Sequence, residues 1–222
     1  MFRSVRPFLE QAGIDDPVVC YQGAAVIDPA SGTFLLHEPL ALESARSVIG
    51  LLVALGHSPN CYVNDRLYVD THTDYSRRYA TFQHLPVEEV GDLVTWLTEP
   101  PTKLAVVADP ADIPALRAAV AEQLADQVYL TTSLPHLLEM GNPAASKGTG
   151  LAFVAERLGA SIERIVSFGD GENDIELIDE AGFGIAVADA NPILLDRADW
   201  VCQSAEVEGV AAVIEAYLDS LP

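Results

Sequence analysis

The stretch "SFGDGEND", residues 167–174, places two aspartates, a glutamate and an asparagine between two apolar segments. Carboxylates crowded in this way repel one another, so the stretch favours a positively charged partner. Oxygen ligands with room for water suit Mg²⁺, which takes one or two carboxylates and completes its shell with phosphate oxygens. Asp170 and Asp174 are therefore candidate metal ligands. The alternative interpretation is an acidic first helical turn that only complements the helix dipole.

Lys147 is the second candidate, because it stands in the first turn of the predicted helix "SKGTGLAFVAERLGA", which Ser146 can cap. The free N–H groups of such a turn favour an anion, and the ammonium adds a compact charge for a phosphoryl group. Taken alone, Lys147 fits a solvated surface lysine equally well. The predicted strand that ends at Asp170 follows Lys147 in the sequence. This order favours a functional role for the lysine.

The elements around these residues alternate strictly. A helix at 146–160 is followed by a strand at 164–170, a helix at 173–182, a strand at 184–188 and helices at about 192–198 and 207–218. Alternating strands and helices predict a parallel sheet covered on both faces. Ligands bind such sheets at the carboxyl ends of the strands, where Asp170 lies. The short glycine-bearing loop that follows can turn Asp170 and Asp174 toward one point.

The first 140 residues have a different texture. A helix that stops at Gly13 and a buried strand running into a hairpin, "PVVCYQGAAVID", come first. From about Leu40 the sequence predicts an α+β block: helices at 42–55, 87–97 and 110–125, a hairpin turning at Asn64-Asp65, and strands at 102–109, 127–133 and 136–140. We therefore expect three parts: residues 1–39, an inserted block at 40–140, and residues 141–222.

Composition excludes several classes of protein. Half of the 222 residues are hydrophobic, which predicts a globular fold, and the net charge of -21 repels nucleic acid and anionic lipid. The longest apolar run, "VIGLLVAL", is too short to span a bilayer, and the first residues contain no signal peptide. Three cysteines without a CxxC motif predict buried free thiols in a cytoplasmic protein. The five histidines show no metal-binding spacing. The oligomeric state stays open.

The lysine helix followed by "IVSFGDGENDIELIDEAGFGIAVADA" resembles the last two motifs of the haloacid dehalogenase (HAD) superfamily. The sequence is most similar to the Cof-type phosphatases (type IIB), which carry an α/β cap inserted ahead of the motif lysine. "PVVCYQGAAVIDPASG" is similar to a further family strand, and the block at 40–140 resembles the cap. The resemblance implies a Rossmannoid parallel-sheet core, here at 1–39 and 141–222, with an inserted α+β cap domain.

The resemblance also implies roles for individual residues. Lys147 holds the phosphoryl group, Asp170 and Asp174 place Mg²⁺, and Asn173 supports the loop or a metal-bound water. Three residues depart from the family pattern. Gln22 replaces the usual asparagine, and Asp189 and Glu172 each add a carboxylate. Gln22 and Asp189 are candidate substrate-binding residues. So are Arg77 and Arg78, the one adjacent basic pair, although two solvated arginines on a cap surface explain that pair as well.

HAD phosphatases attack with the first aspartate of an Asp-x-Asp motif, and a Thr-Gly-Arg motif follows. Neither motif occurs in this sequence. We therefore expect a chain that begins after both motifs, lacks two core strands and the nucleophile, and is inactive alone. Its sheet either stays open at that gap or closes by direct pairing of the strands at 18–22 and 165–170.

The complete protein is expected to hydrolyse a small phosphomonoester with Mg²⁺, a sugar phosphate or a phosphorylated cofactor. Other activities within the superfamily stay open: sucrose-phosphate phosphatase, mannosyl-phosphoglycerate phosphatase and phosphomannomutase. The alternative of a different class is a non-catalytic module that binds phosphate or metal and has lost its nucleophile.

Overall fold

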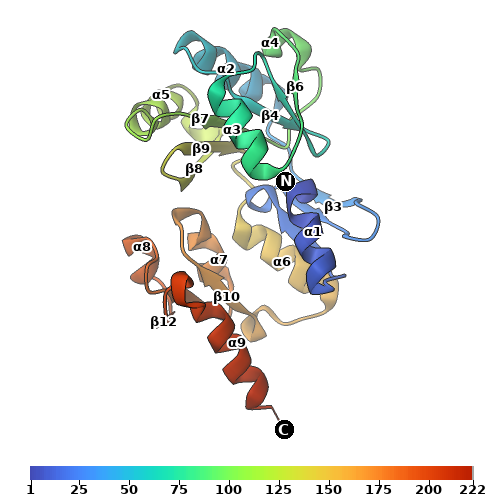
Figure 1. The fold of residues 1–222 in the computed structure, drawn as a ribbon, viewed down its shortest axis with the longest axis vertical. Coiled ribbons are helices and arrows are strands. Elements are labelled where there is room, and N and C mark those ends of the chain that lie inside the picture. The colour runs from blue at the N-terminus through green and yellow to red at the C-terminus, as the bar shows by residue number, and fades with distance from the viewer. Residues whose placement is uncertain (222) are drawn as a thin grey trace. The chain divides into compact units, whose positions relative to one another are not determined.

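A computed structural model describes residues 1–221 and divides them into two compact units. The first unit runs from Met1 to Ala145, and the second begins at Ser146 (Figure 1). The first unit thus takes in both the segment 1–39 and the block 40–140 that the sequence separates. The three-part division of the chain stays a prediction.

The first unit combines helices with two sheets. One sheet is antiparallel and has the order β1-β2-β3; the other has the order β6-β5-β4-β7-β9-β8, in which only β5 and β6 are parallel. The α-helices and strands are α1 (Phe2–Ala12), β1 (Val18–Cys20), β2 (Ala25–Ile27), β3 (Phe34–His37), α2 (Leu42–Ala54), β4 (Asn60–Val63), β5 (Arg66–Val69), α3 (Asp74–Gln83), β6 (Val87–Glu89), α4 (Leu93–Trp96), β7 (Lys103–Val107), α5 (Ile113–Leu124), β8 (Tyr129–Leu134) and β9 (Leu137–Gly141).

Local chemistry accounts for two of the predicted boundaries. Gly13 ends α1 in the left-handed region, with φ of 66°, where the missing Cβ removes the usual steric cost. Asn64 and Asp65 also have positive φ, 51° and 56°, and form the two-residue turn that the right-handed twist of a hairpin requires. Both the end of α1 at Gly13 and the β4–β5 hairpin confirm the sequence predictions.

The six-stranded sheet is covered on both faces. Leu104 and Val106 of β7 belong to a core built with α2 and α5. Ala105, which lies between them and points to the other face, belongs to a second core with residues of α1 and α3. Figure 1 shows α3 lying across the sheet on the side away from α2 and α5. The two cores make the first unit a sheet sandwiched between helical layers.

The second unit has the α/β architecture that the sequence predicts. Its parallel sheet has the order β10-β11-β12, and the described elements are α6 (Lys147–Leu158), β10 (Val166–Gly169), α7 (Ile175–Glu180), β11 (Phe183–Val187), α8 (Pro192–Leu195), β12 (Trp200–Cys202) and α9 (Gly209–Asp219). The core of this unit includes Ile178, Ile185, Val187 and Leu194. Parallel pairing brings the carboxyl ends of its strands to one edge, where the loop after β10 begins.

Strand β10 lies at an edge of the parallel sheet, because its described pairing is with β11 alone. Its first residue, Val166, is 50% exposed, which is unusual for a valine at the start of a strand in an α/β fold. Strand β1 is likewise an edge strand of its own sheet. β1 and β10 therefore belong to different sheets, and the alternative of their direct pairing is wrong for the described residues.

The structure corrects one further predicted element and adds two. The predicted helix at 87–97 is wrong in its first half, because residues 87–89 form β6 and pair with β5. Neither α3 nor β12 was predicted. All three cysteines are buried and free, as predicted. Among the described residues, no helix combines the length and apolarity needed to cross a bilayer.

Candidate functional site

Asp174 is the centre of the candidate site. It is 4% exposed and lies in the short 3₁₀ turn between β10 and α7. Its Oδ2 accepts hydrogen bonds from the backbone N–H groups of Asp170 and Gly171, both at 3.0 Å. Its Oδ1 forms an ion pair with the ammonium of Lys147. The loop after β10 is therefore wrapped around one carboxylate whose two oxygens face different partners.

Asp170 lies beside this carboxylate at the exposed end of β10. Partial burial, followed by the neighbouring Asp174 carboxyl group, raises the pKa of Asp170 above its usual value. Burial alone would also raise the pKa of Asp174, but the Lys147 ammonium and the backbone N–H groups outweigh it and lower that pKa. The two neighbouring carboxyl groups therefore differ in their affinity for a proton, because the Lys147 ammonium and the backbone N–H groups compensate the charge of Asp174 more fully than that of Asp170.

Lys147 reaches Asp174 from the first turn of α6. Ser146 caps this helix by accepting a hydrogen bond from the N–H of Thr149 at 3.2 Å, and the Thr149 hydroxyl accepts one from the N–H of Ser146 at 2.9 Å. This capping box fixes the start of the helix and so the origin of the lysine side chain. The cap that the sequence predicts at Ser146 is confirmed. An ammonium and a helix N-terminus thus stand together next to two carboxylates.

Two glycines let these elements approach. A Cβ at Gly148 would run into the backbone carbonyl of Glu176, so the missing side chain allows α6 to lie directly against α7. A Cβ at Gly169 would lie 2.7 Å from the Cβ of Asp174 and 3.1 Å from a methyl group of Leu194. Close packing at both glycines therefore holds Lys147 and Asp174 in contact. Neither glycine carries a local sequence signal for this positioning role.

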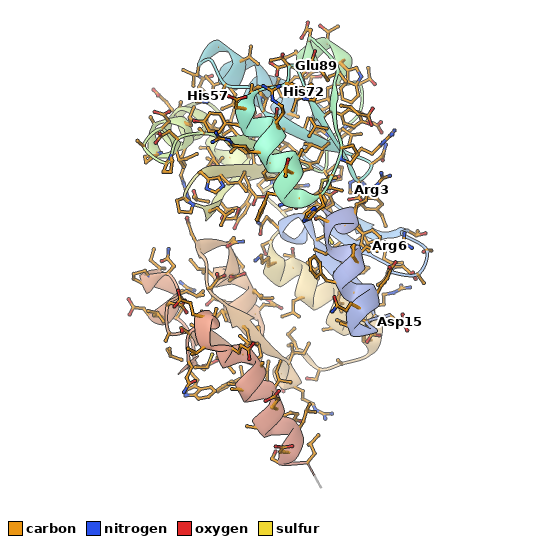
Figure 2. All side chains as sticks on the ribbon, viewed as in Figure 1. Arg3, Arg6, Asp15, His57, His72 and Glu89 are labelled. Atoms are coloured by element: carbon orange, nitrogen blue, oxygen red, sulfur yellow. The ribbon has the colours of Figure 1, made fainter. Side chains whose placement is uncertain are left out.

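The donor set fits a hard divalent cation. Asp170 and Asp174 offer carboxylate oxygens, and the Lys147 ammonium already takes the place of a cation on Asp174. Mg²⁺ commonly binds proteins through one or two carboxylates, with waters and phosphate oxygens as further ligands. No group of three or more His, Cys, Asp or Glu side chains suited to a metal occurs among the described residues. His57 and His72 lie in loops of the first unit (Figure 2).

The remaining candidates of the second unit have separate surroundings. Asn173 is buried, and its Oδ1 occupies the place that a Cβ at Gly171 would take, so it packs inside the loop. Asp189 lies after β11, and its Oδ1 accepts a hydrogen bond from the N–H of Ala205 at 3.1 Å. That bond gives Asp189 a structural partner within the second unit. Asn191 also supports the loop, because its N–H donates to the carbonyl of Asp170 at 2.8 Å.

Gln22, Arg77 and Arg78 belong to the first unit. Gln22 adopts the left-handed conformation, with φ of 57°, and its Nε2 donates to Glu139 Oε1 at 3.0 Å. Arg77 forms an ion pair with Asp74 at 2.9 Å. The structure brings together Lys147, Asp170, Asp174 and Asn173, whereas these three residues remain separate predictions about substrate binding.

Sequence reasoning missed a buried ion pair in the first unit. Lys103 of β7 and Glu139 of β9 are 8% and 4% exposed and form an ion pair on adjacent antiparallel strands. Burying two charges is costly unless both are paired and hydrogen-bonded. The signal was present as a lysine and a glutamate inside otherwise apolar strands, "TKLAVVAD" and "HLLEM", but their partnership depends on strand pairing.

Comparison with known proteins matches the sequence to one family. The family model of haloacid dehalogenase-like hydrolases matches residues 1–214. The chain is 26% identical over 220 residues to 5-amino-6-(5-phospho-D-ribitylamino)uracil phosphatase YitU of Bacillus subtilis, covering 97% of this chain and 81% of that protein. It is 34% identical over 166 residues to phosphoglycolate phosphatase of Methanothermobacter thermautotrophicus, covering 71% and 68%.

A solved structure shares the fold. The X-ray crystal structure of TM0651 from Thermotoga maritima matches 94% of this chain and 79% of its own, with a TM-score of 0.77 and 28% identity. The likeness extends through both compact units, because only a small part of this chain lies outside it.

Proposed function

Because the chain belongs to the haloacid dehalogenase-like hydrolases, we propose that it carries the metal- and phosphate-binding part of a Cof-type, Mg²⁺-dependent phosphatase. The observation that carries the proposal is the ion pair of Lys147 with Asp174, beside the exposed carboxylate of Asp170. One ammonium and two carboxylates at the end of a parallel strand can hold a cation and a phosphoryl group side by side.

Each residue has a distinct task in this proposal. Asp170 and Asp174 hold the metal, and the N–H groups of residues 170 and 171 keep the Asp174 carboxylate oriented. Lys147 turns from Asp174 to a phosphate oxygen when substrate enters and stabilises negative charge there. Asn173 keeps the loop closed from within. When bound, Mg²⁺ supplies charge neutralisation at the phosphate.

The residues named above do not include the nucleophile. No two aspartates of the 222-residue sequence are separated by a single residue, so the Asp-x-Asp pair of the family does not occur in it. We propose that the nucleophile is supplied from outside these residues and that residues 1–222 bind metal and phosphate without turning substrate over. Covalent phosphoryl transfer needs a carboxylate in line with the phosphorus, which the family takes from its Asp-x-Asp motif.

The proposed substrates are small phosphorylated metabolites. The two named relatives are phosphatases of a phosphoribitylamino-uracil and of phosphoglycolate. The leaving group of the first substrate contains a ring, and that of the second is small. We therefore propose a broad substrate class: a sugar phosphate or a phosphorylated cofactor. Gln22, Arg77, Arg78 and Asp189 remain the proposed substrate-binding residues.

A non-catalytic module that binds phosphate or metal is the second candidate, and the lack of an Asp-x-Asp pair favours it. The DNA upstream of the Met1 codon separates the two. An in-frame Asp-x-Asp followed by Thr-Gly-Arg supports the enzyme, whereas an in-frame stop codon with neither motif supports the binding module.

Phosphate binding tests the site itself. Inorganic phosphate is titrated into the protein with and without Mg²⁺ and followed by calorimetry. Lys147→Ala is expected to weaken the Mg²⁺-dependent binding by about tenfold or more, since a charge-assisted hydrogen bond is lost. Arg157→Ala removes a cation from the last turn of the same helix and is the matched control. Equal phosphate affinity of wild type and Lys147→Ala would contradict the proposed role.

A further inference from the structure

One face of α3 lines a groove of about 510 Å³ within the first unit. Its residues on that face are spaced at i, i+3, i+4 and i+7: Tyr75, Arg78, Tyr79 and Phe82. The opposite wall is the end of β7 with Asp109 and Pro110, and His136 of the β8–β9 turn completes the lining. Figure 1 shows α3 lying beside β7. The volume falls in the range of about 300–1,000 Å³ that small-molecule sites occupy.

The aromatic side chains of this groove are unusually accessible. Phe82 is 67% and Tyr75 43% exposed, although both stand on a well-formed helix that packs on a sheet. Tyr79 between them is buried, and its hydroxyl accepts a hydrogen bond from the Tyr62 hydroxyl at 2.8 Å. The groove is therefore lined by one buried and two accessible aromatic rings. Flat rings stack favourably on such surfaces.

The two adjacent arginines, Arg77 and Arg78, have different surroundings. Arg77 donates to the carboxylate of Asp74 at 2.9 Å and to the carbonyl of His72 at 3.4 Å, and it does not line the groove. Arg78 lines the groove and makes no hydrogen bond or ion pair with any described residue. Besides the hydrogen bond and charge of Arg77, the nearby charge of Arg78 helps to lower the pKa of the Asp74 carboxyl group. In a chain with a net charge of -21, a guanidinium that lines a groove without a hydrogen bond or ion pair can still receive an anionic ligand group.

The other polar groups limit what the groove accepts. The Oδ1 of Asp109 accepts a hydrogen bond from the N–H of Ala111 at 2.9 Å, so one oxygen of this carboxylate is already engaged. Its charge opposes a second negative charge on a ligand. His136 and the Tyr75 hydroxyl offer hydrogen bonds at the rim. A planar ring with a single negative charge matches this set best.

We infer that the groove is a binding site for a planar aromatic ring that carries one negative charge. The ring stacks on Phe82 and Tyr75, and its anionic group pairs with the guanidinium of Arg78. The inference concerns the first unit alone, and it does not depend on the proposed phosphoryl chemistry at Lys147.

Three probes that carry no phosphate test the inference about the groove. Their binding is followed by fluorescence or by competition. 2-Naphthoate carries the ring and the charge, 2-naphthalenemethanol carries the ring alone, and cyclohexanecarboxylate carries the charge without a flat ring. We expect saturable binding of 2-naphthoate, seen as a change in its fluorescence, and at least tenfold weaker binding of the other two. Equal affinity for the neutral and the charged naphthalene would remove Arg78 from the inference.

Surface variants keep the test independent of folding. Arg78→Gln is expected to weaken 2-naphthoate binding about tenfold and Phe82→Ala about three- to tenfold. Arg66→Gln, which removes an exposed charge of the first unit that pairs with Glu88 and does not line the groove, is expected to leave the affinity unchanged. If Arg66→Gln and Arg78→Gln weaken binding equally, the site is only a diffuse positive charge and the groove is not the binding site.

Binding of 1-naphthyl phosphate with Mg²⁺ then distinguishes a ring that is part of a substrate from a ring that belongs to a separate effector. If the ring is the leaving group of a substrate, Phe82→Ala and Lys147→Ala both weaken binding of 1-naphthyl phosphate, and 2-naphthoate competes with it. If the ring belongs to a separate effector, 2-naphthoate and inorganic phosphate bind independently. Both outcomes support the groove, whereas binding of 2-naphthoate that is insensitive to Phe82→Ala overturns it.

Discussion

At the scale of single residues, the Lys103–Glu139 pair shows how strongly one contact can matter. Glu139 also accepts hydrogen bonds from Gln22 and Ser133, and the Lys103 ammonium lies 5.1 Å from the ring centroid of Tyr62. The pair is almost completely buried, so each charge depends on its partner. Removing one partner leaves an uncompensated charge in a medium of low polarity.

We therefore predict that Glu139→Gln lowers the free energy of unfolding by about 3–5 kcal/mol, measured by urea denaturation. Glu43→Gln breaks the exposed pair with Arg46 and should cost at most about 1 kcal/mol. The double variant Lys103→Met/Glu139→Leu should be more stable than Glu139→Gln. A loss below about 1 kcal/mol for Glu139→Gln would show that the pair is not the buried contact described.

The same pair predicts a dependence of stability on pH. Burial alone would raise the pKa of Glu139, but the Lys103 ammonium outweighs it and lowers that pKa. A carboxyl group whose pKa is lowered by folding stabilises the fold above its unfolded pKa of about 4.3 and loses this contribution as pH falls through the folded value. The stability difference between wild type and Glu139→Gln should be constant from pH 7 to about 5 and shrink below pH 4. Urea midpoints at pH 7, 5 and 3 check this, and a difference that grows on acidification would contradict it.

At the scale of elements, the contact between β10 and the loop that follows depends on Gly169. Gly169→Ala would place a methyl group against Asp174 and Leu194, so the loop must move and the carboxylate with it. We predict weaker Mg²⁺-dependent phosphate binding and a lower melting temperature. Gly50→Ala is the control, because this glycine lies in α2 with nothing within 4 Å of its added Cβ. That change should stabilise the protein by about 0.5–1 kcal/mol.

The elements that sequence predicts well are those whose signals are local. The capping box at Ser146, the turn at Asn64-Asp65 and the stop at Gly13 each need only neighbouring residues. Strand β6 was mistaken for a helix because "VEEV" shows no alternation, and its extended conformation is set by pairing with β5. The approach of α6 to α7 at Gly148 is likewise invisible in sequence, because it depends on tertiary packing.

At the scale of the whole molecule, the motifs predicted the family and the α/β architecture, and the change of pattern near residue 141 lies close to the unit boundary at Ser146. No sequence signal joined residues 1–39 to the block at 40–140. Residues 1–39 join the first unit because Phe2 and Tyr21 pack into the same core as Tyr62 and Ala105 of the six-stranded sheet. The Phe2 and Arg3 N–H groups also bond to Asp65, at 2.9 and 3.0 Å. Such contacts join residues about sixty positions apart, and periodicity within a segment carries no information about them.

The proposal for the whole chain predicts no turnover. Residues 1–222 are expected to hydrolyse p-nitrophenyl phosphate no faster than background in the presence of Mg²⁺. Lys147 and a bound metal can stabilise charge, but the sequence contains no Asp-x-Asp pair that could act as nucleophile and general base, and a general base alone contributes about 10²–10⁴-fold. Release of p-nitrophenolate measures this. Robust Mg²⁺-dependent turnover that Lys147→Ala abolishes would mean that the chain supplies its own nucleophile.

The most direct test of the central claim is a calorimetric titration of Mg²⁺ into the wild type and Asp170→Asn. The account predicts weak, saturable binding by the wild type and clearly weaker binding by Asp170→Asn, since one carboxylate ligand loses its charge. Asp219→Asn removes an exposed carboxylate at the end of α9 and should bind like the wild type. Identical Mg²⁺ affinities of wild type and Asp170→Asn would contradict the claim that the loop after β10 is a metal site.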